Sequence, residues 1–167
     1  PLAAIGGPFE LVNGNGETVT DKDFAGKPLA IYFGFTYCPE VCPTTLTEMQ
    51  GWIESLGPDA DRLNFLFVTV DPERDTPDVM RDYVAAFDKR IVPLSGSREQ
   101  VDAVVKTYRV YAKKVPLDDG DYTMDHSAAV FLMNSDNRFV GTIAYGEDEE
   151  NALKKLRRLI DNAPKTS

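Results

Sequence analysis

Long apolar runs and helical repeats alternate along the chain. Residues 29–35 and 63–70 are predominantly apolar, which is typical of strands in the middle of a parallel sheet that helices cover on both faces. From Pro43 onward the apolar residues instead recur every three or four positions, which predicts a helix. The residues on its apolar face are Leu46, Met49, Ile53 and Leu56.

The same patterns predict the elements that follow residue 70. Asp75 or Thr76 is placed to cap a helix that has Pro77 in its first turn. Ser97 and Gln100 have the spacing of a capping box. The expected elements are a helix with its apolar stripe at 79–87, a strand at 91–94, a helix at 97–108, antiparallel strands at 128–133 and 138–143, and a closing helix from about 148 to 162.

Two segments are predicted to lie outside this alternation. The sequence Asn-Gly-Asn-Gly at 13–16 separates two β-like runs, and Asn-Gly in that setting indicates a β-hairpin near the N-terminus. Residues 109–124 form an excursion, interpreted as an inserted hairpin or loop, before the segment that carries His126 and the strand after it.

The order strand–helix–strand–helix, followed by a hairpin and a final helix, predicts an α/β fold with a central mixed sheet flanked by helices. The chain has 167 residues, which is enough for a sizeable core. Because no linker rich in Gly, Ser or Pro divides it, we expect a single domain over residues 1–167.

Charge narrows the classes of partner. The formal net charge is -9 and the pI is ≈ 4.6, which argues against nucleic acid or an anionic membrane surface as a partner. No apolar run approaches the length of a membrane span, and no signal peptide is visible within the chain.

The only two cysteines, Cys38 and Cys42, lie between the first apolar strand and the first helix. The unpaired N–H groups and the dipole of a helix N-terminus favour thiolate, the form that attacks disulfides and binds soft metals. Three intervening residues in a tight turn allow either a disulfide or a shared metal ion. A site of this kind at the end of a central strand is the thioredoxin-like arrangement.

Four motifs in order resemble those of the Sco/SenC family. They are the sequences at 32–43, 70–77, 108–111 and 125–127, and the resemblance extends from Pro8 to the final helix. It implies a thioredoxin-like fold and a mononuclear copper site built from Cys38, Cys42 and His126. Two soft thiolates and one imidazole suit Cu(I) and leave room for Cu(II) to take a further ligand, so we expect one copper ion per chain in either oxidation state.

The resemblance also implies partners and a location. The expected role is a metallochaperone that delivers copper to the CuA centre of cytochrome c oxidase subunit II. A copper-donating chaperone and a thiol reductant are expected as further partners. Family members are tethered by one N-terminal helix, so we expect a membrane anchor upstream of residue 1. The expected location is the bacterial periplasm at the inner membrane, with the mitochondrial intermembrane space as the alternative.

Residues around the cysteines are candidates for shaping the site. Pro39 and Pro43 are expected to shape the turn, with Pro43 at the first helical position. Tyr37 is expected to line the rim of the site. Asp71 is interpreted as a helix cap or as a hydrogen-bonding anchor for the cysteine loop.

Other residues are candidates near the histidine. Asp125 is expected to lie in water, and the alternative is that it orients His126. Met124 is a candidate for an extra ligand because it lies close to His126, whereas Met133 lies in an apolar strand and is expected to be core.

Three other readings of the cysteines remain at this point. One is a thiol–disulfide oxidoreductase in which Cys38 attacks and Cys42 resolves, keeping the cysteines of the oxidase subunit reduced. Another is a plain structural disulfide. The third is a peroxidase of the peroxiredoxin or glutathione peroxidase type, which the sequence disfavours because Thr36 is two residues before Cys38 and no proline precedes it in register.

Overall fold

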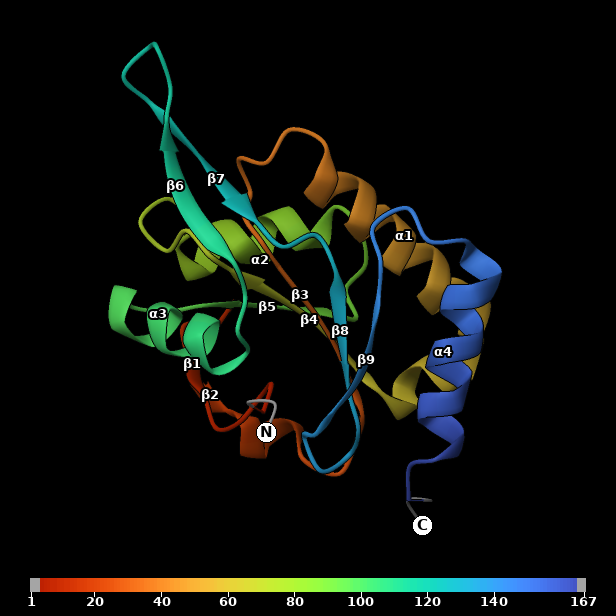
Figure 1. The fold of residues 1–167 in the computed structure, drawn as a ribbon. Coiled ribbons are helices and arrows are strands. Elements are labelled where there is room, and N and C mark those ends of the chain that lie inside the picture. The colour runs from red at the N-terminus through yellow and green to blue at the C-terminus, as the bar shows by residue number, and fades with distance from the viewer. Residues whose placement is uncertain (1–3, 165–167) are drawn as a thin grey trace.

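The computed structural model describes residues 4–164, and within that range the strands form a mixed seven-stranded sheet and a separate two-stranded sheet (Figure 1). The strands are β1 (Glu10–Asn13), β2 (Thr18–Thr20), β3 (Leu29–Gly34), β4 (Asn64–Thr69), β5 (Ile91–Ser95), β6 (Ala112–Pro116), β7 (Tyr122–His126), β8 (Val130–Met133) and β9 (Phe139–Ile143). The helices are α1 (Val41–Leu56), α2 (Pro77–Ala85), α3 (Arg98–Thr107) and α4 (Glu149–Asp161), with short 3₁₀ helices η1 (Asp21–Phe24) and η2 (Gly57–Arg62).

The central sheet has the strand order β2-β1-β5-β4-β3-β8-β9. Strands β3, β4 and β5 are parallel, with Leu29 opposite Asn64 and Phe65 opposite Ile91. Strands β1 and β8 flank this parallel centre and run antiparallel to it. Every residue of β3 is buried, which agrees with the expectation from its apolar run, and the mixed sheet predicted from the sequence is confirmed.

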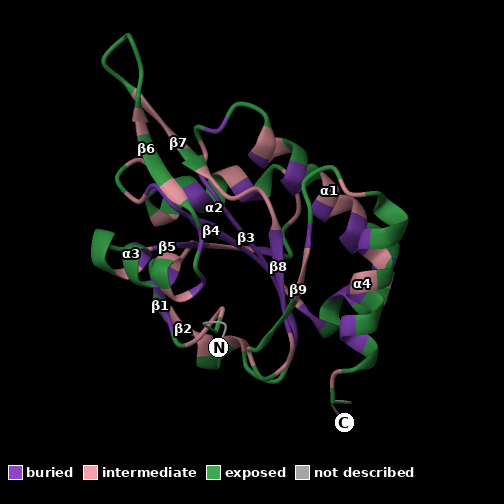
Figure 2. Ribbon diagram, in the orientation of Figure 1, coloured by how far each residue is buried: buried purple, intermediate pink, exposed green. Residues whose placement is uncertain are grey.

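Alternate side chains of β3 reach the two apolar layers that enclose the sheet. Tyr32 stacks on Phe67, which also packs against Tyr83 of α2, and the Tyr32 hydroxyl reaches α1. Phe33 points to the opposite face, where it packs against Tyr108 at the end of α3. Helices α1 and α2 therefore cover one face and α3 covers the other, while α4 packs beside α1; the strands between them are buried (Figure 2).

Both predicted hairpins are present. Strands β1 and β2 pair antiparallel, and the Asn13 side chain accepts hydrogen bonds from the N–H groups of Asn15 and Glu17 in the turn. Residues 112–126 form the β6–β7 hairpin, in which Ala112 lies opposite His126. This hairpin projects from the body of the molecule (Figure 1) and pairs only with itself within the described residues.

Helix α1 starts earlier than expected, and α2 starts at the expected cap but without the capping hydrogen bond. Helix α1 begins at Val41 rather than at Pro43, which is its third residue; proline is tolerated there because the first N–H groups of a helix have no intrahelical partner. Thr76 is the N-cap of α2, but its hydroxyl donates to the Asp78 carboxylate and not to the helix backbone. Among residues 4–164, no helix combines the length and apolar content needed to cross a membrane.

Candidate metal centre

The two cysteines come from the junction between β3 and α1. Cys38 lies in the loop that leaves β3, and Cys42 is the second residue of α1. Both are free thiols and both are buried, at 8% and 0% exposure. The Cys42 backbone N–H, one of the unpaired donors of the helix N-terminus, donates to the Cys38 sulfur at 3.3 Å. The helix start therefore holds the Cys38 sulfur beside the helix axis.

His126 reaches the cysteines from the end of β7. With its Nδ1–H donating to the Ser127 carbonyl oxygen, 2.8 Å away, the ring presents the Nε2 lone pair toward the sulfurs. Nε2 lies 3.5 Å from the Cys42 Sγ. The ring packs edge-on against Phe35, with ring centroids 5.5 Å apart. This tautomer is the one that a metal ligand needs.

The ligand atoms of Cys38, Cys42 and His126 all lie within 4.8 Å of one another. Folding thus brings the two sulfurs together with an imidazole that lies more than 80 positions further along the sequence. Thiolate sulfur and imidazole nitrogen are ligands that Cu(I) accepts. The residue set and its spacing fit one soft metal ion.

A cleft of ≈ 240 Å³ opens beside these residues. Cys38 and His126 line it together with Pro39, Glu40 and Met124, whereas Cys42 lies behind it. A larger cleft of ≈ 620 Å³ between β9 and α4 contains none of the three ligand residues. Of these two clefts, the smaller is thus the one that leaves Cys38 and His126 accessible.

The two thiols differ in acidity. The hydrogen bond from the Cys42 side chain, with a further bond from the Cys42 N–H, lowers the pKa of Cys38 to about 4 against the effect of burial. The same thiol–thiol hydrogen bond, together with burial, raises the pKa of Cys42. At neutral pH the pair therefore carries its negative charge on Cys38. The expected help from the helix N-terminus is seen at Cys38, which accepts the Cys42 N–H, whereas the pKa of Cys42 is governed by the thiol pair and by burial.

Tyr32 packs against the buried side of the two cysteines. Its hydroxyl donates to the Cys42 Sγ at 3.5 Å. Burial, with the nearby Cys42 as a second cause, raises the pKa of Tyr32, so it remains a protonated donor. Gly34 lies beside it, and a Cβ at that position would meet the Cys42 Sγ at 2.7 Å. Strand β3 thus leaves room for the Cys42 sulfur only because position 34 has no side chain.

The other residues that the sequence suggested for the site lie in different surroundings. Pro39 and Met124 line the cleft. Tyr37 is 59% exposed beside Cys38, with the Arg74 guanidinium 4.3 Å from its ring centroid. Met133 is fully buried in the core, as expected.

Asp71 and Asp125 differ from the roles first considered. Asp71 is fully buried and accepts hydrogen bonds from Arg74 Nε at 2.6 Å and the Tyr122 hydroxyl at 2.8 Å. It thereby anchors the β6–β7 hairpin and not the cysteine loop. Asp125 is exposed, as first expected, and the carbonyl of Ser127 is the group that orients His126.

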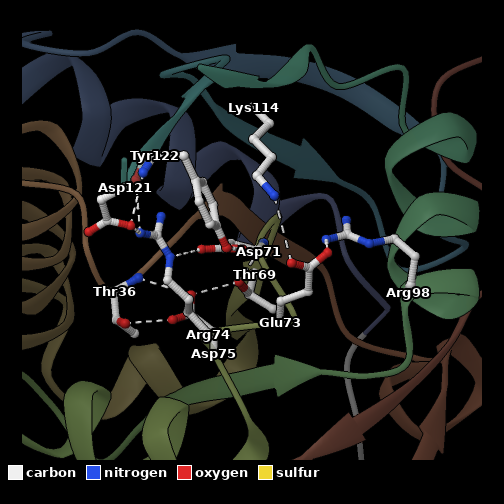
Figure 3. A network of polar contacts seen from close by, with 10 residues as sticks. All are labelled: Thr36, Thr69, Asp71, Glu73, Arg74, Asp75, Arg98, Lys114, Asp121 and Tyr122. Carbon is white, nitrogen blue, oxygen red and sulfur yellow. Dashed lines mark hydrogen bonds and ion pairs between the residues drawn. The ribbon is translucent and has the colours of Figure 1, made fainter. Parts of the chain in front are cut away.

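The anchor of the cysteine loop is Asp75, which the sequence reading treated only as a helix cap. Its carboxylate accepts hydrogen bonds from the Thr36 N–H at 2.9 Å, the Thr36 hydroxyl, and the Thr69 hydroxyl at 2.7 Å (Figure 3). Burial raises the pKa of this fully buried carboxyl. The available signal was an acidic residue in a turn after a buried strand, which does not specify a partner 39 positions away.

Comparisons with known proteins agree with this geometry. A copper-bound structure of Bradyrhizobium japonicum ScoI is 50% identical, has a TM-score of 0.87, and is matched over 93% of this chain and 99% of that one. A copper-bound structure of yeast Sco1 is 34% identical, with a TM-score of 0.87 over 97% of this chain and 91% of that one. The thioredoxin-like fold expected from the sequence is thus confirmed.

Sequence relatives give the family. The human mitochondrial SCO1 homolog is 44% identical over 142 residues, which are 81% of this chain and 46% of that protein. The chain spans about half the length of the first curated relatives that it matches. The model of the SCO1/SenC family matches residues 1–161. With this match over nearly its whole length, the chain belongs to the SCO1/SenC family.

Proposed function

We propose that this chain is a copper metallochaperone that binds one copper ion through Cys38, Cys42 and His126 and delivers it during assembly of cytochrome c oxidase. The observation that carries the proposal is the gathering of the three ligand atoms within 4.8 Å of one another. The copper-bound structures of similar proteins support it. Copper is the cargo of this activity.

The unequal thiols suit capture and release of Cu(I). Cys38 is already a thiolate at neutral pH and lines the cleft, so it is the first ligand that an arriving ion meets. Cys42 must lose its proton to become the second ligand, and copper capture therefore releases a proton. Three protein ligands and an open side let an acceptor's thiolate join the ion and take it by ligand exchange, which a closed four-ligand site does not permit.

The acceptor that we propose is the CuA centre of cytochrome c oxidase subunit II, with a copper-donating chaperone and a thiol reductant acting upstream. The proposed location is the bacterial periplasm, with the chain tethered to the inner membrane by an anchor that precedes residue 1. Family membership supports these assignments.

A second candidate activity is thiol–disulfide exchange, and the lowered pKa of Cys38 favours it. The Cys38 thiolate would attack a disulfide of the acceptor and release one acceptor thiolate, forming a mixed disulfide. Cys42, after losing its proton, would attack the Cys38 sulfur and release the second acceptor thiol. The acceptor gains two electrons, the Cys38–Cys42 pair becomes a disulfide, and the thiol reductant restores it.

Replacing the histidine separates the two activities. We expect His126→Ala to weaken Cu(I) binding to the reduced protein by at least tenfold, because one of three ligands is lost, while dithiol exchange with a model disulfide keeps its rate within about threefold. Competition titration with a Cu(I) chelator measures the affinity, and spectra of the Cu(II) form report thiolate and imidazole ligation.

Asp125→Asn is the matched control, because Asp125 is the exposed neighbour of His126 on the same strand. It should bind Cu(I) as the unmodified protein does. Unchanged copper affinity in His126→Ala would reject His126 as a ligand and the carrier with it.

A further inference from the structure

The turn between β4 and α2 carries a polar network that contacts Thr36 of the cysteine loop and Tyr122 of the β6–β7 hairpin (Figure 3). At one end of the turn, Asp75 holds Thr36 of the cysteine loop. Asp71, near the start of the turn, and Arg74, next to Asp75, hold Tyr122 of the hairpin that ends in His126. One short segment thus contacts the elements that supply the sulfurs and the imidazole.

Arg74 is the side chain that joins the two elements directly. Its guanidinium carbon lies 4.3 Å from the centroid of the Tyr37 ring and 3.7 Å from that of the Tyr122 ring. Tyr37 precedes Cys38, and Tyr122 lies in the same strand as His126. The guanidinium is thus stacked against one aromatic ring from each half of the site, an arrangement that suits its flat, delocalised charge.

Hydrogen bonds fix the orientation of this guanidinium. Nε donates to the Asp71 carboxylate at 2.6 Å, and Nη1 donates to the Tyr122 carbonyl oxygen at 2.8 Å and to Asp121 at 3.3 Å. Nη2 is buried and has no hydrogen-bond partner among the described residues. The bonds to Asp71 and Tyr122 thus hold the guanidinium between the two rings.

The hairpin depends on such tethers for its position. Strands β6 and β7 pair only with each other within residues 4–164, and an isolated two-stranded hairpin is marginally stable in water. Away from its base, its polar contacts with the turn are those of Tyr122 with Asp71 and Arg74. Two exposed ion pairs add to them, Asp121 with Arg74 at 3.3 Å and Lys114 with Glu73 at 3.8 Å. Exposed pairs of this kind contribute little. The contacts of Tyr122 with Arg74 and Asp71 are therefore the main polar tether, and Arg74 is the member that also reaches the cysteine loop, through Tyr37.

We propose that Arg74 is a positioning residue for the metal centre: it holds the β6–β7 hairpin against the cysteine loop and so keeps the His126 imidazole within bonding reach of the two sulfurs. Arg74 acts through Tyr37 and Tyr122 and does not touch the ion. The inference rests on the proposed copper site for its effect on binding, while its effect on the hairpin applies to the metal-free protein.

Arg74→Lys tests the proposal with the charge kept, so that buried Asp71 retains a cation. Lysine loses the flat fork that stacks on both rings and bonds Tyr122. We expect amide hydrogen exchange of residues 112–126 in the metal-free, reduced protein to speed up at least tenfold while β3 and β4 keep their protection. Cu(I) affinity, measured by chelator competition, should fall by roughly tenfold, the lower end of the range for residues that orient metal ligands.

Arg98→Lys is the matched control. Arg98 pairs with Glu73 in the same network at 2.9 Å, but it is 45% exposed and lies on α3. The same substitution there should change neither hairpin exchange nor copper affinity by more than about twofold. Tyr122→Phe, which removes the bond to Asp71 and keeps the stacking, should give an effect between those of the two lysine variants.

A double-mutant cycle with His126→Ala separates positioning from a general loss of stability. If Arg74 acts through the imidazole, Arg74→Lys should weaken Cu(I) binding in the parent protein and change it less than twofold in the His126→Ala background. Equal weakening in both backgrounds, or hairpin exchange unchanged by Arg74→Lys, would overturn the inference. A failure of the proposed function has a different signature: copper affinity that His126→Ala leaves unchanged, whatever the hairpin does in the metal-free protein.

Discussion

Cys38 and Cys42 are separated by three residues, yet their surroundings give the two sulfurs different chemistry. Cys38 faces a cleft and accepts hydrogen bonds from the first turn of α1 and from its partner thiol. Cys42 is fully buried beneath Tyr32 and serves as the donor in the thiol pair. The result is one thiolate nucleophile that lines the cleft and one fully buried, protonated thiol at neutral pH.

This difference predicts the pH dependence of alkylation. A thiol whose pKa is lowered to about 4 is ionised throughout the neutral range, so the alkylation rate of Cys38 should be flat from about pH 6 to pH 8 and fall as the pH decreases through about 4. An ordinary thiol, with a pKa of about 8.5, would instead react roughly tenfold faster per pH unit across that range. Site-resolved mass spectrometry of iodoacetamide labelling measures the profile.

Cys42→Ala provides the comparison, because it removes the largest cause of the lowered pKa. The Cys38 profile should move toward higher pH in this variant. A parent profile that climbs steadily through neutral pH would contradict the assignment of the thiolate to Cys38.

At the residue scale, the sequence was most informative where a motif specifies chemistry. The ligand set of Cys38, Cys42 and His126 followed from the Sco/SenC resemblance, and the structure brings these residues together. The anchors Asp75 and Arg74 were missed, because their partners Thr36 and Tyr122 lie 39 and 48 positions away. No local pattern indicates such pairings, so only the fold can show them.

At the scale of elements, the metal centre depends on how closely α1 approaches β3. A Cβ on Gly34 would lie 2.7 Å from the Cys42 Sγ and 2.9 Å from the Phe67 ring. Both distances are shorter than packed side chains tolerate. The strand and the start of the helix are therefore fitted to each other at the position of the buried ligand.

Gly34→Ala should displace Cys42 and disturb the copper site. We expect unfolding free energy to fall by about 1–3 kcal/mol, as for overpacking elsewhere, and Cu(I) affinity to fall with it. Gly51→Ala is the control: Gly51 lies inside α1, and the nearest atom to its added Cβ is 3.9 Å away. That substitution should raise stability by about 0.5–1 kcal/mol. Urea denaturation of both variants measures the contrast, and an equally stable Gly34→Ala protein would contradict the close fit.

The buried elements were predicted better than the exposed ones. The apolar runs of β3 and β4 identify central strands, whereas residues 109–124 predict only a hairpin or a loop, because the segment shows no apolar face. The start of α1 was placed two residues late, at Pro43 in place of Val41. Proline marks the first turn of a helix but does not specify which of its positions it occupies.

At the scale of the whole molecule, the order of the strands could not be predicted from the sequence pattern. The N-terminal hairpin was predicted, but its pairing with β5, where Val12 lies opposite Ser95, was not. The inserted hairpin was predicted too, but its pairing apart from the main sheet and its delivery of His126 to Cys42 at the start of α1 were not. Periodicity specifies which face of an element is buried, while the neighbour of each strand depends on contacts between distant segments.

The assembly of the site by the whole fold predicts that copper stabilises the folded protein. The unfolded chain keeps two cysteines four positions apart and so retains some affinity for Cu(I), but it loses His126 from the site and the N–H bond to Cys38. At a free Cu(I) concentration about 1,000 times the dissociation constant, the stabilisation has an upper limit of about 4 kcal/mol, or on the order of 10 °C in Tm for a domain of this size. Scanning calorimetry of the reduced protein under buffered Cu(I) measures this shift.

His126→Ala should show a clearly smaller shift, because the ligand that only folding supplies is absent. An equal shift in a variant with both cysteines changed to serine would place the copper elsewhere on the molecule.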